Sequence, residues 1–175
     1  WMYEETMRIP LVLSGNISFT DSQKINKTDL VQNIDLAPTI LDSVKIKSPK
    51  DMHGRSLLPL LEQNSSTSAD WRKVLYFHYH AFPDEQMVPK HIGIRTSSHK
   101  LIHYYQFNEW ELFDLDNDPH ENLNLYKNES NQKQVSELNS ELDKLKTWFQ
   151  DNTDISVMPE EWRKIHRGPE ARKKD

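Results

Sequence analysis

The hydrophobic residues between positions 132 and 149 recur at intervals of three and four, which is the period of an amphipathic α-helix. The apolar stripe of this predicted helix consists of Val135, Leu138, Leu142, Leu145 and Phe149. Asn131 precedes the stripe as a candidate N-cap, and Gln134 is placed to reach back as in a capping box. The pattern therefore predicts one long helix whose single apolar side covers another element.

The stretch before this helix follows a period of two instead. Residues 71–80 alternate with aromatic side chains on both faces of a predicted strand, and residues 91–106 predict two strands joined by a tight turn at Ser97 and Ser98. Residues 110–115 predict a fourth strand. Four strands at such short spacing indicate a small antiparallel sheet, and the helix at 132–149 is the element expected to cover one of its faces.

The first seventy residues have a different pattern. The short apolar run at residues 8–15 predicts a buried strand of a mostly parallel sheet, and residues 30–34 predict another short strand. A helix is expected to begin after Asp35 as its N-cap, with Pro38 in the first turn, where a missing N–H costs nothing. Residues 56–63 predict one or two helical turns, and the Ser-rich stretch 64–70 is the best candidate for a boundary. The apolar side of the helix after Asp35 consists of Leu36, Ile40, Leu41 and Val44.

Composition narrows the classes of function. The net charge of −5 argues against nonspecific binding to nucleic acid or to anionic membranes, so neither is expected as a partner. The absence of cysteine excludes disulfides, thiolate metal sites and a cysteine nucleophile within the 175 residues. The first residue is Trp1 rather than Met, which is what a fragment of a longer protein shows.

The stretch FDLDNDPHENLNL at residues 113–125 raises the question of a metal site. Asp114, Asp116 and Asp118 have the odd-position spacing of a calcium loop, but no Gly stands at the sixth position and no Glu at the twelfth. Asp and Asn next to Pro are also turn residues, because their side chains bond the local backbone. The residues favour a turn between the last strand and the long helix.

Five stretches together resemble sulfatases of the arylsulfatase type, members of the alkaline-phosphatase-like superfamily. ELFDLDNDPHENLNL is similar to their ELYDLxxDPxExxNL signature, and IGIRTSSHKLIHY to their GVRTxxYKLI strand pair. WMYEETMRIPLVL, VQNIDLAPTILD and DMHGRSLLPLL are similar to segments that follow an active-site lysine in that family. The resemblance runs from Trp1 to Phe149, departs at Lys45 where the family usually has Gly, and is closest to bacterial glycan and N-acetylglucosamine-6-sulfatase-like members.

The resemblance implies an α/β fold in which residues 1–68 end the catalytic α/β domain. Residues 69–150 would then form a C-terminal subdomain, a four-stranded antiparallel sheet packed on a long helix, and residues 151–175 an extended tail. It also implies hydrolysis of sulfate esters on sulfated glycans such as 6-O-sulfated amino sugars, and a periplasmic or secreted location.

The catalytic parts of that family are absent from this sequence. The resemblance implies a formylglycine nucleophile made from a C/S-x-P-S-R motif and a calcium ion held by aspartates, and neither the motif nor its ligand pattern occurs here. No catalytic or metal-binding residue is therefore assigned to this chain. It is expected to be inactive alone and to need the N-terminal catalytic part of the same protein as its partner.

Candidate substrate contacts follow from the resemblance as well. His91 is expected to bind the sugar and Lys90 is a second choice, although Gln86 stands where the family has an earlier histidine. Arg95 is expected to form an internal ion pair with Glu111 or Asp114. Two pairs of residues each allow two interpretations. Glu4 and Glu5 are either supports for the upstream lysine or surface residues, and His78 with His80 are either strand residues or a zinc pair.

Two other functions compete with this interpretation. A phosphonate monoester or phosphodiester hydrolase has the same superfamily fold, and only the upstream nucleophile and metal ligands would separate it from a sulfatase. A noncatalytic carbohydrate-binding or interaction module would use the aromatic strand at 71–79 as a stacking platform. Against the module, the predicted strand at 8–15 and the helix after Asp35 would leave apolar faces uncovered.

Overall fold

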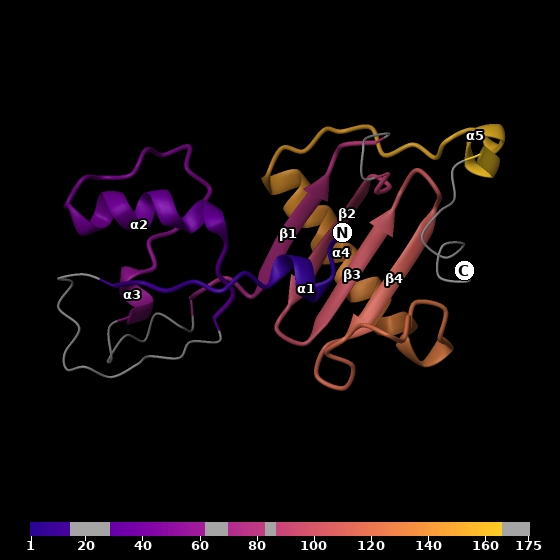
Figure 1. Cartoon of the computed structure of the whole chain (residues 1–175), viewed down its shortest axis with the longest axis horizontal. Helices are drawn as coiled ribbons and strands as arrows, with labels where there is room; N and C mark the ends of the chain where they lie inside the picture. The colour runs from indigo at the N-terminus through magenta and orange to yellow at the C-terminus, as the bar shows by residue number, and fades with distance from the viewer. Residues whose placement is uncertain (15–28, 62–69, 83–86, 166–175) are drawn as a thin grey trace. The chain divides into compact units, whose positions relative to one another are not determined.

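The computed structural model describes residues 1–14, 29–61, 70–82 and 87–165 (Figure 1). The chain divides into two compact units. One unit joins Trp1–Ile9 to Tyr76–Asp175, and the other is Pro10–Leu75. We call them the sheet unit and the α2 unit, and describe each by itself.

The sheet unit is built on a four-stranded antiparallel sheet. Its strands are β1 (Val74–Tyr79), β2 (His91–Thr96), β3 (His99–Tyr104) and β4 (Glu109–Asp114), in the order β1-β2-β3-β4. The register pairs Gly93 of β2 with Ile102 of β3, and Leu101 of β3 with Leu112 of β4. The four predicted strands and the tight turn between β2 and β3 are confirmed.

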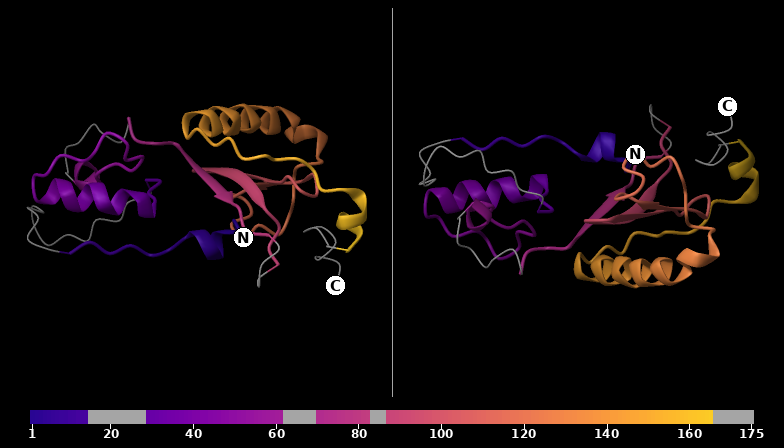
Figure 2. Two further views of the ribbon diagram at one scale, coloured as in Figure 1. Left: turned by 90° about the horizontal axis from the view of Figure 1, so that it is seen from above. Right: turned by 90° about the horizontal axis from the view of Figure 1, so that it is seen from below.

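Helix α4 (Gln132–Trp148) covers one face of this sheet, as Figure 2 shows. It contacts β2 and β3 and buries Val135, Leu138 and Leu142, so the predicted apolar stripe is confirmed. The predicted capping box is wrong. Asn131 occupies the N-cap position without a side-chain capping bond, and the Asn128 side chain instead accepts from the backbone of Ser130 in the preceding 3₁₀ turn (Glu129–Asn131). Through that extra turn, a backbone N–H just before α4 already has a hydrogen-bond partner.

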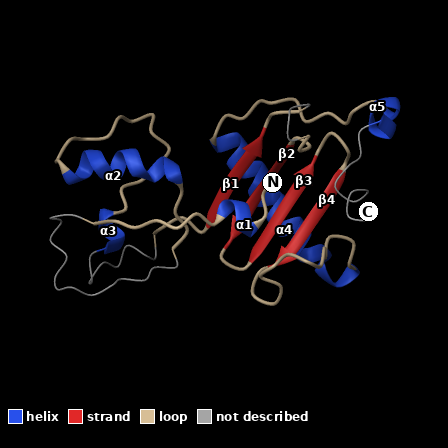
Figure 3. Cartoon of the chain, in the orientation of Figure 1, coloured by secondary structure: helices blue, strands red, loops and turns tan. Residues whose placement is uncertain are grey.

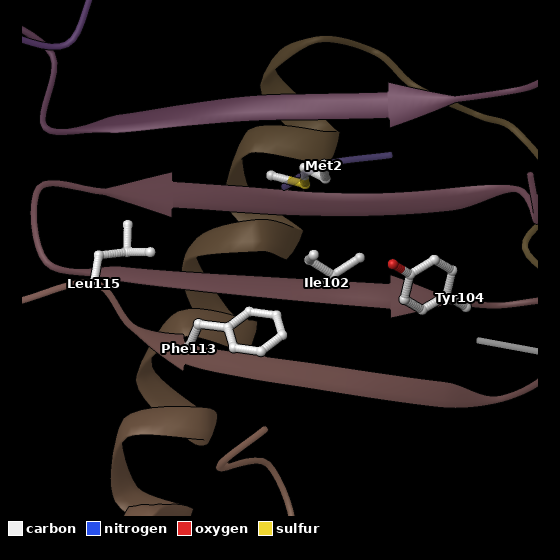
Figure 4. Close-up of a cluster of buried hydrophobic side chains, with 5 residues drawn as sticks. All are labelled: Met2, Ile102, Tyr104, Phe113 and Leu115. Atoms are coloured by element: carbon white, nitrogen blue, oxygen red, sulfur yellow. The ribbon is translucent and has the colours of Figure 1, made fainter. Parts of the chain in front are cut away.

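The opposite face of the sheet is covered by the first residues of the chain. Helix α1 (Glu4–Met7) and the residues before it lie on this face (Figure 2). Met2 is fully buried in a cluster with Ile102, Tyr104, Phe113 and Leu115, drawn in Figure 4. The packing is so close that a Cβ on Gly93 would lie 2.6 Å from the Met2 sulfur. The first nine residues thus belong to the core of the sheet unit.

Two predicted strands of the α2 unit are not formed. Residues 8–14 are an irregular and mostly exposed segment, drawn as loop after α1 in Figure 3, and Gly15 lies outside the described residues. Residues 30–34 lead instead into a 3₁₀ turn (Asn33–Asp35) and then into α2 (Leu36–Ser43). A strand needs a neighbour for its backbone N–H and C=O groups, and no described segment pairs with either run.

The predicted helix after Asp35 is confirmed, but Asp35 has a different role from a side-chain N-cap. Its fully buried carboxylate accepts two hydrogen bonds of 2.6 Å from the Arg72 guanidinium and one of 2.9 Å from the Arg55 backbone. The predicted short helix is α3 (Leu58–Leu61). Nearby, the Trp71 indole packs on Leu57 and Leu60. Among its described residues, the α2 unit is therefore held by a buried ion pair and a small apolar cluster.

The segment after α4 runs to a short helix, α5 (Glu160–Ile165), and residues 166–175 lie outside the described residues. The predicted extended tail is thus partly helical. Among the helices that the structure describes, none has both the length and the apolar character needed to cross a membrane.

Candidate functional site

His91, the predicted sugar contact, is the first residue of β2 and its side chain is fully buried. Its ring packs between aromatic neighbours, with centroids 5.6 Å from Phe77, 5.4 Å from Tyr79 and 5.1 Å from Tyr104. Nδ1 lies 2.7 Å from the carbonyl oxygen of Pro89. Because a carbonyl only accepts, Nδ1 carries the proton and Nε2 presents a lone pair.

Burial lowers the pKa of His91 to about 4, in spite of the hydrogen bond to Pro89, which acts in the opposite direction. The start of the chain lies near this ring, since Trp1 and His91 both pack on Tyr104, with ring centroids 5.9 Å and 5.1 Å away. At neutral pH the ring is uncharged. Its buried Nε2 has no hydrogen-bond partner among the described residues. The ring can accept a hydrogen bond but cannot neutralise a carboxylate.

Lys90, the second predicted contact, is half-buried, and its backbone N–H donates to the Gln106 side chain at 3.3 Å. It stands next to His91 in the chain at the end of the loop between β1 and β2. Residues 83–86 of that loop, including Gln86, lie outside the described residues. Whether His91 and Lys90 contact a sugar stays a prediction.

Glu4 belongs to a buried cluster of charges rather than to the surface. Its carboxylate lies 2.9 Å from the Lys100 ammonium and 3.0 Å from the Arg95 guanidinium. Lys100 is fully buried and lies 2.6 Å from Glu121, whose other oxygen accepts the Glu4 backbone N–H at 2.6 Å. Burial alone would raise the pKa of Glu4, but hydrogen bonds and charge from Arg95 and Lys100 lower it to about 2.

The predicted partners of Arg95 are therefore wrong. Arg95 pairs with Glu4, which is 91 positions away in sequence. Glu111 is buried on the same sheet but accepts hydrogen bonds from the hydroxyls of Tyr3, at 3.0 Å, and Tyr104, at 3.1 Å. Glu5, unlike Glu4, is exposed.

His78 on β1 and His80 just after it lie side by side, with ring centroids 3.7 Å apart. Both ring nitrogens of His78 face protein groups, since Nδ1 lies 2.5 Å from the Asp151 carboxylate and Nε2 lies 3.2 Å from the Tyr105 hydroxyl. Burial lowers the pKa of His78, and the attraction of Asp151 does not reverse this. Tyr76 donates to the same carboxylate. Sequence reasoning missed Asp151, because nothing in the tail pattern connects it to β1.

The turn at residues 114–121 uses its carboxylates locally. Asp114 accepts from the backbone of Asp116 at 3.1 Å and of Asn117 at 3.2 Å, and Asp118 accepts from the backbone of Leu123 at 2.8 Å. The bond from the Asn117 side chain is the main reason why the pKa of Asp114 is lowered. The predicted turn is confirmed. Within the described residues, no group of three or more His, Asp or Glu is arranged to hold a metal ion.

The aromatic residues of the proposed stacking platform pack against other side chains. Trp71 is 8% exposed, and the ring of Tyr76 stacks on Phe149 at 5.1 Å. Tyr79 stacks on His91. A sugar-binding platform needs open ring faces, and these contacts bury Trp71 and occupy one face each of Tyr76 and Tyr79.

Comparison with known proteins supports the motif-based resemblance. The family model described as N-sulphoglucosamine sulphohydrolase, C-terminal, matches residues 1–148. Over 155 residues the chain is 39% identical to an N-acetylglucosamine-6-O-sulfatase of Bacteroides thetaiotaomicron, covering 87% of this chain and 27% of that protein. It is 30% identical over 137 residues to an arylsulfatase of Clostridium perfringens, covering 78% of this chain and 27% of the relative. The chain thus spans about a quarter of the length of these relatives.

Solved structures give the same result. A protein in complex with its substrate, D-glucosamine-2-N,6-O-disulfate, superposes with a TM-score of 0.65 at 41% identity, covering 69% of this chain and 25% of that one. A 2-O glycosaminoglycan sulfatase superposes with a TM-score of 0.59 at 27% identity, covering 71% and 27%. Because the family model matches most of the chain, the chain belongs to the N-sulphoglucosamine sulphohydrolase C-terminal family and is the C-terminal region of a sulfatase.

Proposed function

We propose that the protein containing this chain hydrolyses sulfate esters of amino sugars, with 6-O-sulfated glucosamine as its substrate class. The main support is the 39% identity to an N-acetylglucosamine-6-O-sulfatase over 155 residues. The 41% identity to the protein bound to D-glucosamine-2-N,6-O-disulfate points to the same sugar. A periplasmic or secreted location is part of the proposal, and cell fractionation of the natural source tests it.

The reacting groups would lie outside this chain. Sulfatases typically use calcium, which would bind the anionic ester, but within the described residues no group of three or more His, Asp or Glu is arranged to hold a metal ion, and several carboxylates are already engaged. Asp35 is paired with Arg72, Glu4 and Glu121 with Lys100, and Asp114, Asp118 and Asp151 bond their own surroundings. We therefore propose that the chain shapes the sugar-binding end of the enzyme and takes no part in bond cleavage.

Within that role we propose His91 as a hydrogen-bond acceptor for a sugar hydroxyl and Lys90 as a weaker anion contact. The packing of Trp1 and His91 on the same ring, Tyr104, supports this, because the polypeptide carrying the catalytic groups would join the chain there. The unpartnered Nε2 is the acceptor. The ring is fully buried in this chain. A hydrogen bond to the sugar therefore requires that the Nε2 atom becomes accessible to the substrate in the full-length enzyme.

The test compares His91→Phe with His80→Ala in the full-length enzyme. Phe keeps the packing against the rings around His91 but removes the acceptor, whereas His80 is exposed at the end of β1. We expect kcat/KM on N-acetylglucosamine-6-sulfate to fall by about 10- to 100-fold for His91→Phe, since losing one hydrogen-bond partner costs about 1–3 kcal/mol. The kcat/KM of His91→Phe on a small aryl sulfate should equal that of the parent enzyme. Unchanged turnover of the sugar, or an equal loss on both substrates, would contradict the proposal.

A phosphonate or phosphodiester hydrolase is the second candidate. The chain is 30% identical to the multifunctional alkaline phosphatase superfamily protein PehA of Trinickia caryophylli, covering 69% of this chain and 25% of that protein. Assaying the full-length enzyme with a phosphonate monoester beside the 6-O-sulfated sugar separates the two. Faster turnover of the phosphonate would replace the sulfatase proposal.

A further inference from the structure

The segment that follows α4 is tied to β1 at its beginning. The Asp151 carboxylate accepts the hydroxyl of Tyr76 and lies 2.5 Å from Nδ1 of His78. The ring of Phe149, at the C-cap of α4, stacks on Tyr76 with centroids 5.1 Å apart. The His78 side chain is only 4% exposed, so water cannot easily replace its bond to Asp151. We call residues 149–158 the strap.

The strap ends on the turn between β3 and β4. The backbone N–H of Met158 donates to the Gln106 carbonyl oxygen at 2.9 Å. Between its two anchors the strap crosses the end of the sheet at which β1 ends and β2 begins, above the strands in the view of Figure 1. Near the first anchor, Asp151 also accepts the Thr153 backbone N–H at 3.0 Å. Groups of the sheet unit therefore fix the strap at both ends.

The same turn holds both described ends of the loop between β1 and β2. The side-chain oxygen of Gln106 accepts the Lys90 backbone N–H at 3.3 Å. The ring of Phe107, the next residue of the turn, packs edge-on against Phe82 with centroids 6.1 Å apart. Gln106 thus bonds the strap through its carbonyl and the residue before His91 through its side chain. A displacement of the strap would be passed on to Lys90 through this one residue.

We infer that the strap and Gln106 position Lys90 and His91 for the sugar, and that Gln106 is a positioning residue for substrate specificity. A contact made by one hydrogen bond depends on a backbone held to within about 0.5 Å, and such support comes from the residues behind it. The inference rests on the proposed function, in which His91 and Lys90 are the sugar contacts. The family model ends at residue 148, so family membership does not assign this role to the strap.

The first measurement is backbone hydrogen exchange of the full-length protein without substrate. Asp151→Leu removes the anchor of the strap at β1. Asp154→Leu is the matched control in the same segment, because Asp154 is exposed and accepts the backbone N–H of the nearby Ser156. We expect residues 150–158 and 87–91 to exchange at least about 10-fold faster in Asp151→Leu than in the parent. Both segments should exchange at the parent rate in Asp154→Leu.

The second measurement is turnover by the full-length enzyme. Gln106→Leu removes the acceptor of the Lys90 N–H, whereas Gln106→Glu keeps an oxygen in its place. We expect the KM for N-acetylglucosamine-6-sulfate to rise by about 3- to 10-fold in Gln106→Leu, the effect of one lost hydrogen bond, and to stay near the parent value in Gln106→Glu. The kcat/KM for a small aryl sulfate should be the same for both variants and the parent.

Three results would overturn the inference. Faster exchange of residues 150–158 with unchanged exchange of 87–91 would show that the strap can be released without effect on Lys90. Unchanged exchange of both segments would show that Asp151 does not hold the strap. If Asp151→Leu does not fold, equal KM values for the two Gln106 variants overturn it. A parent enzyme inactive on the sugar would refute the proposed function, and that result is separate from exchange rates measured without substrate.

Discussion

Removing the ammonium of Lys100 should destabilise the sheet unit strongly. Lys100 is fully buried between the carboxylates of Glu4, at 2.9 Å, and Glu121, at 2.6 Å. In Lys100→Met, Glu4 would keep Arg95 at 3.0 Å, so the uncompensated charge would be Glu121, whose side chain is 1% exposed. Breaking a buried pair costs about 3–5 kcal/mol. Because only one carboxylate loses its cation, we expect about 3 kcal/mol.

Urea unfolding of the chain, followed by circular dichroism, measures this free energy, provided that the slope of the transition is unchanged. The double variant Lys100→Met, Glu121→Gln should recover about 1–2 kcal/mol, since Gln removes the orphan charge and its oxygen still accepts the Glu4 N–H. Lys133→Met is the control, because the Lys133 side chain is 90% exposed and should change stability by less than about 0.5 kcal/mol. A cost below about 1 kcal/mol for Lys100→Met, or no recovery in the double variant, would refute the reasoning.

Two further predictions concern the same face of the sheet. The pKa of Glu4 is lowered from 4.5 to about 2, so its stabilising effect is present above about pH 4.5 and is lost as the pH falls through about 2. Melting temperatures measured across this window should fall more steeply for the parent chain than for Glu4→Gln, and parallel curves would contradict the assignment. Gly93→Ala places a Cβ 2.5 Å from the Leu101 carbonyl oxygen, and since the sheet backbone cannot yield easily, we expect a loss of about 1–3 kcal/mol by urea unfolding. A urea midpoint for Gly93→Ala equal to that of the parent would contradict this, because it would show that β2 and β3 can move apart at Gly93 without loss of stability.

The sheet unit was largely predictable because its signals are local. The alternation in β1 to β4 and the spacing in α4 report which side of each element is buried, and the turn residues between β2 and β3 fix their connection. The prediction of a strand at residues 8–15 was wrong because a short apolar run indicates burial but does not specify a partner strand. In this chain residues 8–14 remain irregular, without a pairing strand among the described residues.

The electrostatic contacts were not predictable for a different reason. Arg95 and Glu4 are 91 positions apart, and His78 and Asp151 are 73 apart, so no periodic pattern links them. His91 was correctly placed at the start of a strand, but its complete burial depends on rings from β1 and β3. Long-range partners of charged side chains follow from topology, and a single sequence does not encode that topology locally.

The burial of Met2 beneath the sheet has a consequence for how this protein can be divided. The polypeptide leaves the sheet unit at Ile9 and returns at Tyr76, so the α2 unit is an insertion between two pieces of one core. Cutting the chain between the units would remove Met2 and expose Ile102 and Tyr104 to water. Any shortened version of the sheet unit must therefore retain Trp1–Ile9, joined to the later strands by a linker. Truncation at a single point in the sequence cannot yield this unit, because its core comes from both ends of the chain.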